Sequence, residues 1–428
     1  MEKVLIISYY FPPANMPASF RVLSWAQYLK SSGYYPIIIT RRWDNDIKTP
    51  GDLIRKSVNT MRHEKSDDYE VYALPHQESL RDKIYLQMGK KLILVRKLLT
   101  FYNAFLENFS SSIVPYKNLY RFAKAFLADN RDIKKLIITG NPFPLFRLGY
   151  LFHQEFNIHW IADYRDEWST TDWDYLKSGW RRFTYELEKK SEKKWIKTSS
   201  AITTVTPYFV QKLHRFHQKP ASVVYNGFFE KECASYRKLN SYSQFTFTFA
   251  GTLYHLQEIE STLRPITLLI KEYEKRLPIR ILFPGLGFDK VQENRVTQTL
   301  AGFENNYKIT PRIPKNELLS ILGQSHIMLL LSAGNLKGNI QAKLFDYIGL
   351  HKPVLLYPSD HDILEQILIE TRLGIIPTSE KETYSMLKKI IDKYLTDSLI
   401  DIHPNIESIN KFSREEQAKA MVKVLDNL

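Results

Sequence analysis

Short, uninterrupted apolar runs alternate with helix-length segments along almost the whole sequence. Runs of this kind are typical of parallel strands that are buried on both faces, whereas half-exposed antiparallel strands show alternating polarity. The pattern predicts an α/β fold made of β-α-β units. The expected strands of the first half are Val4–Ser8, Pro36–Thr40, Leu136–Thr139, Trp160–Ala162, Ala201–Val205 and Val223–Tyr225, with a helix over Ser19–Ser32 that ends at Gly33.

A polar, turn-prone segment interrupts this series at Asn226–Ser243, after which the apolar runs begin again. The chain has 428 residues, which is more than one hydrophobic core usually serves. We therefore predict a first domain over residues 1–230, a second over residues 231–410, and a helix over residues 411–428 that docks on one of them. The strands expected in the second half are Phe245–Ala250, Ile279–Phe283, Tyr307–Thr310, Ile327–Leu331, Val354–Tyr357 and Gly374–Ile376.

Two doubly wound, Rossmann-like domains bind ligands beyond the carboxyl ends of their strands. We expect the two domains to face each other across a cleft, and the functional residues to follow strands directly. Three such positions carry polar or glycine-rich clusters.

The charge of the chain favours a negatively charged partner. It contains 60 basic and 46 acidic residues, a formal net charge of +14. Arg81–Phe109 combines lysines with apolar residues at helical spacing, which is typical of a helix on an anionic membrane surface. Packing of that apolar face on its own domain is the alternative. A nucleic-acid partner is not expected, because no nucleic-acid-binding module accompanies the charge.

Cysteine content and hydropathy bear on the compartment. Cys233 is the only cysteine, so no internal disulfide forms. No apolar stretch approaches the roughly 18 residues that span a bilayer, and the N-terminal run has no signal-peptide cleavage site. We expect a cytoplasmic protein, peripheral on the inner face of the cell membrane if the basic helix binds lipid.

The first cluster is the loop Tyr10–Arg21, YFPPANMPASFR, which enters a helix. The amides and dipole of a helix N-terminus can bind phosphate, with Asn15 and Arg21 as polar side chains nearby. The alternative is a stiff proline turn in which Ser19 caps the helix.

The second cluster, Ala162–Trp168, reads ADYRDEW. A carboxylate of Asp163 or Asp166 can accept the proton of a hydroxyl or bind sugar hydroxyls, with Arg165 orienting it. A structural ion-pair network explains the same residues equally well.

The third cluster is Ser332–Pro353, SAGNLKGNIQAKLFDYIGLHKP. A helix beginning near Ile340 can direct the amides of Gly338, Asn339, Ile340 and Gln341 at a diphosphate. Asp346 can then accept two ribose hydroxyls, and Lys343 can neutralise a leaving phosphate. A surface ion pair between Lys343 and Asp346 is the alternative.

Glycine turns follow two further strands of the second half, at Gly251-Thr252 and at Gly285. Glycines let a backbone approach a ligand closely, so these turns are candidate donor-binding positions. The glycines lack the spacing of a dinucleotide fingerprint, and we expect no metal site.

Taken in order, several of these segments resemble retaining GT-B glycosyltransferases of family 4, the glycosyl transferases group 1 type. The N-terminal YYFPPANMPASFR with its YL-x-x-x-G helix end, ADYRDEW, VVYNGF, FAGTLY, ILFPGLG and NIQAKLFDYIGLHKPVLL carry the resemblance. It implies two Rossmann-like domains, a nucleotide-sugar donor held mainly by the second and an acceptor held by the first.

The resemblance also implies an activity: metal-independent transfer of a sugar, with retention, to a saccharide acceptor that is lipid-linked, in surface polysaccharide biosynthesis. No cofactor is implied. The chain departs from the family pattern where it has Gly338 in place of an acid and no Arg or Lys shortly after Gly251. These departures favour an alternative, a catalytically degenerate sugar-nucleotide-binding protein in a polysaccharide assembly complex.

Overall fold

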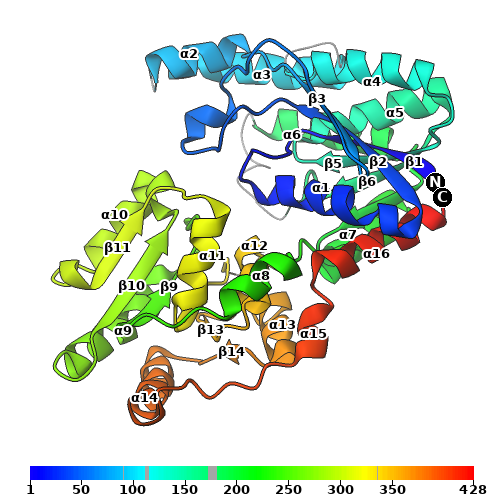
Figure 1. Cartoon of the computed structure of the whole chain (residues 1–428). Coiled ribbons are helices and arrows are strands. Elements are labelled where there is room, and N and C mark those ends of the chain that lie inside the picture. Colours follow the sequence, from blue (N-terminus) through cyan, green and yellow to red (C-terminus); the bar gives the residue numbers. More distant parts are fainter. Residues whose placement is uncertain (90, 111–114, 172–180, 335) are drawn as a thin grey trace. The chain divides into compact units, whose positions relative to one another are not determined.

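The computed structural model describes residues 1–89, 91–110, 115–171, 181–334 and 336–428 (Figure 1). It divides into two compact units. Unit 1 comprises Met1–Tyr225 and Gln417–Leu428, and unit 2 comprises Asn226–Glu416. The chain therefore crosses between the units at the Asn226-Gly227 turn and returns at its C-terminal helix. Lys90, part of the basic stretch, lies outside the described residues.

The core of unit 1 is an eight-stranded sheet in the order β3-β4-β2-β1-β5-β6-β7-β8. Its strands are β1 (Glu2–Ser8), β2 (Tyr34–Arg41), β3 (Arg62–Lys65), β4 (Glu70–Leu74), β5 (Lys135–Gly140), β6 (His159–Tyr164), β7 (Ala201–Thr204) and β8 (Ala221–Val223). All neighbours pair in parallel except β3 and β4. The sequence analysis predicted neither β3, whose residues are polar and mostly exposed at the sheet edge, nor β4, a short strand that is mostly buried.

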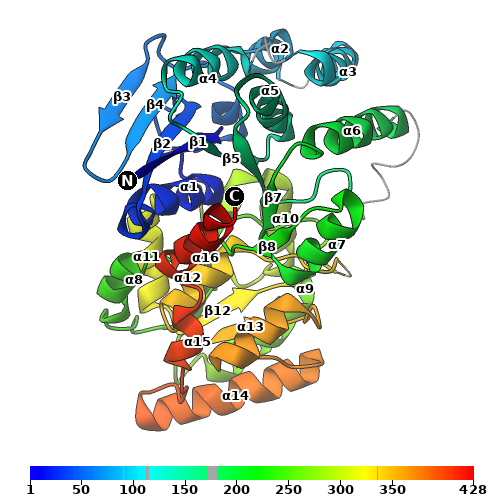
Figure 2. The same cartoon turned by 90° about the vertical axis from the view of Figure 1, so that its right-hand side faces the viewer.

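Helices cover both faces of this sheet (Figure 2). On one face α1 and α16 contribute Val22, Trp25, Met421 and Leu425 to a buried cluster, and α4 and α5 cover the other. The C-terminal helix thus packs on unit 1. The helices are α1 (Pro17–Tyr28), α2 (Leu80–Met88), α3 (Ile93–Phe109), α4 (Lys117–Asp129), α5 (Phe146–Phe156), α6 (Arg181–Ile196), α7 (Pro207–His217) and α16 (Arg414–Asp426).

The first helix begins two residues earlier than expected. Pro17 occupies its first turn, where a missing N–H costs nothing, and Met16 is the N-cap residue. Ser19 lies inside the helix, fully buried, so the expected Ser19 cap is wrong. Helix α1 ends at Tyr28, earlier than expected; a short 3-10 turn, Lys30–Ser32, follows it, and Gly33, with a φ of 92°, caps that turn.

Unit 2 has a six-stranded sheet in the order β11-β10-β9-β12-β13-β14, parallel throughout. Its strands are β9 (Phe245–Thr248), β10 (Ile279–Pro284), β11 (Tyr307–Thr310), β12 (Ile327–Leu330), β13 (Val354–Leu356) and β14 (Gly374–Ile375). Its helices are α8 (Glu230–Arg237), α9 (Ile259–Tyr273), α10 (Lys290–Thr299), α11 (Lys315–Gln324), α12 (Ala342–Gly349), α13 (Ile363–Thr371), α14 (Glu380–Asp397) and α15 (Ile406–Asn410).

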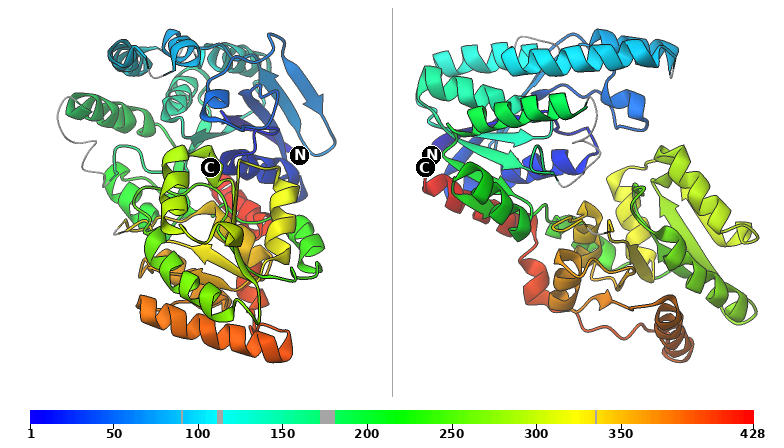
Figure 3. Two further views of the ribbon diagram at one scale, coloured as in Figure 1. Left: turned by 90° about the vertical axis from the view of Figure 1, so that its left-hand side faces the viewer. Right: turned by 180° about the vertical axis from the view of Figure 1, so that it is seen from behind.

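The two faces of this sheet are covered by different helices (Figure 3). On one face α9 and α14 pack on Phe245, Phe247 and Ile281 of β9 and β10. Helices α8, α11 and α12 lie on the other face. The sheet is therefore buried on both sides, as its continuous apolar strands require.

Helix α3 packs against α6, and this contact contains two acidic side chains. Burial, reinforced by the neighbouring charge of Glu188, raises the pKa of Glu107 to about 7. Burial likewise raises the pKa of Glu188, which accepts a hydrogen bond from the indole of Trp168. Among the described helices, none is long and apolar enough to span a membrane.

The raised pKa of Glu107 predicts a pH-dependent stability. The folded state holds this proton more tightly than the unfolded state, so unit 1 loses stability as pH rises from about 4.5 to about 7. The variant Glu107→Gln should remove that loss, a gain on the order of 2 kcal/mol at pH 8 and little gain at pH 5. Urea unfolding at both pH values measures it. Glu186→Gln, an exposed position on α6, is the control, and an equal gain at both pH values would contradict this explanation.

Candidate functional site

Strand order changes direction once in each sheet, and ligands of doubly wound folds bind at such points. In unit 1 the chain moves outward from β1 through β2 on one side and from β5 through β8 on the other. In unit 2 the corresponding neighbours are β9 and β12. The loops that leave β1, β9 and β12, together with the helices they enter, contain most of the candidate residues named from the sequence.

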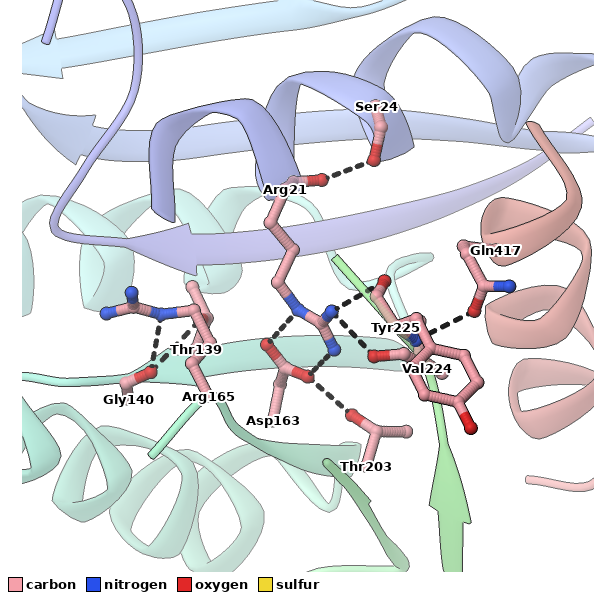
Figure 4. A network of polar contacts seen from close by, with 10 residues as sticks. All are labelled: Arg21, Ser24, Thr139, Gly140, Asp163, Arg165, Thr203, Val224, Tyr225 and Gln417. Carbon is pink, nitrogen blue, oxygen red and sulfur yellow. Dashed lines mark hydrogen bonds and ion pairs between the residues drawn. The ribbon is translucent and has the colours of Figure 1, made fainter. Parts of the chain in front are cut away.

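At the switch point of unit 1, Arg21 of α1 forms a buried ion pair with Asp163 at the end of β6 (Figure 4). The pair is bidentate: Nε of Arg21 lies 3.0 Å from Oδ2 of Asp163, and Nη2 lies 2.6 Å from Oδ1. The two side chains are 1% and 0% exposed. The hydroxyl of Thr203 on β7 donates a third hydrogen bond to Asp163, over 2.7 Å.

The remaining donor group of Arg21 ties the end of the domain to this pair. Its Nη1 donates to the carbonyl oxygens of Val224 and Tyr225, at 2.7 and 3.1 Å. The amide of Tyr225 in turn donates to the side chain of Gln417, the first residue of the returning segment. One guanidinium therefore connects α1, β6 and the last residues before the chain leaves unit 1 (Figure 4).

This geometry changes the roles expected for Arg21 and Asp163. Both are fully buried and bonded to each other, so Arg21 does not face a phosphate and Asp163 does not face an acceptor hydroxyl. The structural alternative, an ion-pair network, describes them. They position the loops around the switch point.

Arg165, Asp166 and Asn15 lie in the loops themselves. The guanidinium of Arg165 donates to the carbonyl oxygens of Gly140 and Asn141 after β5, at 2.8 and 2.6 Å, and burial lowers its pKa. Asp166 is exposed. Asn15 accepts a hydrogen bond from the amide of Ile47, which joins the proline loop to the segment after β2. Of this group, Asp166 is the side chain that remains accessible to a ligand.

A buried cluster under this loop was not expected from the sequence. Glu192 of α6 is fully buried and accepts hydrogen bonds from the hydroxyl of Tyr164 and the amide of Ser169, at 2.9 and 3.0 Å. His217 of α7 lies 3.1 Å from the same carboxylate. The cluster fixes the loop 165–169 from below. Glu192 and His217 belong to two different helices, and the periodicity of each helix, taken alone, places its charged residues on a solvated face. The sequence therefore does not indicate that the two side chains meet.

In unit 2, two glycine turns meet at the ends of β9 and β10. Gly251 and Gly285 have φ values of 78° and 93°, which favour glycine. A Cβ atom on Gly285 would lie 3.1 Å from Cα of Gly251, whereas a Cβ on Gly251 would meet open space. The hydroxyl of Tyr347 on α12 accepts a hydrogen bond from the amide of Ala250 and fixes this exit against the helix. Thr252 follows in the same turn.

Lys343 on α12 points its ammonium group at the same exit. Its Nζ lies 3.2 Å from the carbonyl oxygen of Thr252 and 3.6 Å from the ring centroid of Phe249. Burial lowers its pKa to about 7, and no nearby charge contributes to the shift. In the described part of the chain no carboxylate pairs with Lys343, so the alternative given for this cluster, a surface pair between Lys343 and Asp346, does not form.

The loop from β12 into α12 is held by two glutamines. The side-chain amides of Gln257 and Gln341 both donate to the carbonyl oxygen of Leu331, and Gln257 also donates to Gln341. Gly338, with a φ of 70°, donates its amide to Asp362 over 2.6 Å. The side chain of Gln341 and the amide of Gly338 are thus bonded within the protein.

Helix α12 begins at Ala342, with Gln341 as N-cap, and not near Ile340 as expected. Asn339 and Ile340 lie in the irregular, partly buried segment before it. The first amides of a helix have no partner within it, so those of Gln341, Ala342 and Lys343 are placed to meet an anion, whereas the amide of Gly338 is bonded to Asp362.

Asp346, one turn after Lys343, forms an ion pair with Lys315 at the start of α11, with 2.5 Å between Nζ and Oδ2. The carboxylate is 18% exposed. Lys315 is 31 residues away in sequence, and only the packing of α11 beside α12 reveals the pair. No cluster of three or more metal-ligating side chains occurs among the described residues.

Comparison with known proteins rests on structure alone, because no family model and no curated protein matches the sequence. Sucrose-phosphate synthase from Thermosynechococcus elongatus matches with a TM-score of 0.63 and 12% identity, over 100% of this chain and 99% of that one. Trehalose-6-phosphate synthase OtsA matches with 0.64 and 12%, over 100% and 99%. Anabaena Alr3699/HepE in complex with UDP and glucose matches with 0.60 and 9%, over 100% of both chains.

The chain has the GT-B fold. This confirms the expected fold class, with two parallel-sheet units of eight and six strands in which only β3 is antiparallel. Identities of 9 to 12% establish the fold and not the chemistry of the site.

The buried pair predicts a large coupling between two positions. Arg21→Met leaves the carboxylate of Asp163 buried without its partner and should cost about 3 to 5 kcal/mol of the stability of unit 1. Adding Asp163→Asn should recover part of that loss, because it removes the uncompensated charge. Chemical unfolding of both variants measures the coupling. Lys3→Met, which breaks the exposed pair with Asp132, is the control, and strictly additive effects would argue against the network.

Proposed function

We propose that the protein is a retaining, metal-independent glycosyltransferase of family 4 that moves a sugar from a nucleotide-sugar to a saccharide acceptor. The observation that carries the proposal is Lys343. It is a desolvated lysine at the switch point of unit 2, beside two glycine turns and the first turn of α12, with no carboxylate partner among the described residues. A bound anionic group would stabilise the charged form of this lysine.

The donor diphosphate supplies that anionic group. It would accept hydrogen bonds from the first amides of α12 and from Lys343, and the space beside Gly251 admits the approach. Asp346 would accept ribose hydroxyls with the oxygen that Lys315 does not hold. The solved neighbour Alr3699/HepE, in complex with UDP and glucose, supports a nucleotide-sugar as the ligand class.

The chemistry then follows from charge. The bond between the anomeric carbon and the diphosphate oxygen breaks, and the acceptor oxygen bonds to that carbon on the same face. The acceptor proton goes to the departing phosphate oxygen, so no strong general base is needed. Lys343 and the helix amides stabilise the negative charge that grows on the leaving group, which is the main catalytic contribution.

On the acceptor side, the exposed Asp166 and the loop that Arg165 holds are the candidate contacts. We propose a lipid-linked saccharide as acceptor and a role in surface polysaccharide biosynthesis. The support is the basic, apolar segment Arg81–Phe109 of unit 1.

One observation favours a second candidate, a sugar-nucleotide-binding protein without catalysis. Gly338 stands where the resembling family has an acid, and Asp346 is already neutralised by Lys315. Both candidates bind the donor, and only the transferase turns it over.

A screen of nucleotide-sugars tests the function directly. One donor at about 100 times its dissociation constant should raise the stability by about 2.7 kcal/mol, seen as a rise in melting temperature. Release of nucleoside diphosphate should follow and continue in EDTA. Stabilisation without release would favour the binding protein, dependence on added manganese would contradict the metal-independent mechanism, and an epimer of the donor as product would replace the transferase proposal.

A second test addresses Lys343. An anionic donor favours the charged lysine, so donor affinity should fall as pH rises above about 7, where the free site loses its proton. Lys343→Met should weaken donor binding at least about tenfold at pH 7 and flatten this pH dependence, and Lys343→Arg should keep binding and flatten it too. Titration calorimetry between pH 6 and 8, about one pH unit either side of 7, measures both effects.

Lys352 offers a matched control. It follows the opposite end of α12, and burial also lowers its pKa, to about 8. Lys352→Met should therefore leave donor affinity and its pH dependence unchanged. An equal loss in both variants would trace the effect to stability and remove Lys343 from the donor site.

A further inference from the structure

Helix α3 carries a stripe of exposed apolar side chains along its whole length. Leu94, Leu98, Tyr102, Phe105 and Phe109 are 71%, 71%, 56%, 41% and 59% exposed. Their spacing of three and four residues places them within about 80° around the helix at 3.6 residues per turn. No residue of α3 is fully buried. We refer to these five side chains as the α3 stripe.

The rest of α3 holds the helix on unit 1. The ring of Phe101 lies 5.8 Å from that of Phe183 on α6, and Glu107 is enclosed beside Glu188. Arg147 of α5 donates to the last carbonyl oxygens of the helix, at Asn108 and Phe109. The α3 stripe is therefore not the face that α3 uses to pack on its own domain. Figures 1 and 2 show α2 and α3 as the outermost helices on this side of unit 1.

The charges around the α3 stripe are mainly positive. The segment from Leu80 to Phe109 contains six basic residues and two acidic ones. Lys91 and Lys97, at the N-terminal end of the stripe, are exposed. The α6 helix beside it adds exposed Lys190, Lys193 and Lys194. A narrow apolar face flanked by lysines is suited to the boundary between headgroups and acyl chains of an anionic bilayer.

We propose that the α3 stripe docks the protein on an anionic membrane surface, with its apolar side chains in the interfacial layer and Lys91 and Lys97 at the headgroups. Charge complementarity selects this occupant. A second copy of the same face would bring like charges together, at a cost that an anionic bilayer does not impose. This inference does not depend on the proposed donor site, because α3 belongs to unit 1 and the donor site to unit 2.

The docked helix is also connected to the candidate acceptor loop. Helix α6 packs on α3, and its Glu188 and Glu192 accept hydrogen bonds from Trp168 and Ser169 of the loop after β6. The same helix thus supports the membrane-facing stripe and the loop that carries Asp166. If the proposed transfer reaction holds, a lipid-linked acceptor would meet a loop supported by the docking element.

Vesicle flotation of the full chain tests the proposal. The protein should float with vesicles of phosphatidylcholine and phosphatidylglycerol at low salt, and not with phosphatidylcholine alone. Raising the salt to about 0.5 M should reduce binding at least about fivefold, since exposed charges are screened. Leu98→Ser with Phe105→Ser should reduce binding at least about tenfold. Leu268→Ser with Val291→Ser, which removes two exposed apolar side chains of unit 2, should not.

A site-specific probe separates insertion from other contacts. Cys233 is buried, so Leu98→Cys introduces a single accessible thiol for an environment-sensitive fluorophore. Its emission should shift to the blue with anionic vesicles, while the same label at Leu268→Cys should not respond. The proposal fails if neither flotation nor a shift occurs at low salt, or if both labels respond alike. A shift that grows with protein concentration without vesicles would assign the α3 stripe to a second copy of the chain instead.

Discussion

The buried pair of Arg21 and Asp163 is the interaction on which the arrangement of unit 1 depends. Two charges removed from water are tolerated only when their hydrogen-bonding capacity is filled, and here Thr203 and two backbone carbonyl groups complete the set. The partners come from α1, β6, β7 and the end of the domain. A single charged centre therefore specifies how the loops at the switch point lie, which an apolar contact of the same size would do less strictly.

Unit 2 also has a charged residue at its switch point, Lys343, but this residue has no ion-pair partner among the described residues. Lys343 is desolvated, and its ammonium group contacts only a carbonyl oxygen and an aromatic ring. Part of the free energy lost on burying its charge therefore stays uncompensated. Its lowered pKa expresses that cost. The guanidinium group of Arg21 is fully hydrogen-bonded within the protein, whereas the ammonium group of Lys343 lacks an anionic partner among the described residues. Because ligands of this fold bind at switch points, an anionic ligand gains the most binding free energy beside Lys343.

Much of this fold follows from the sequence because parallel strands buried on both faces leave a signal that few other structures produce. Every strand expected from an apolar run exists, within a few residues at its ends. The edge strand β3, with polar residues on an exposed edge, leaves no such signal, and the short strand β4 beside it was missed although it is mostly buried. The start of α1 was misplaced since Pro17 sets the helix N-terminus and the buried Ser19 only imitates a cap.

The site was harder to predict, because motif residues and their partners lie far apart in the sequence. Asp163 and Lys343 stand at strand exits as their motifs indicate, but their roles depend on Arg21, Thr203 and Phe249, which only the packing reveals. A charge in a motif has two possible fates, a partner within the protein or a ligand from outside. Spacing in the sequence predicts ion pairs only between neighbours on one helix. Lys343 and Asp346 are such neighbours and do not pair, because the carboxylate of Asp346 pairs with Lys315 of α11 instead. Lys343, which has no carboxylate partner among the described residues, is therefore the lysine placed to meet an anionic ligand.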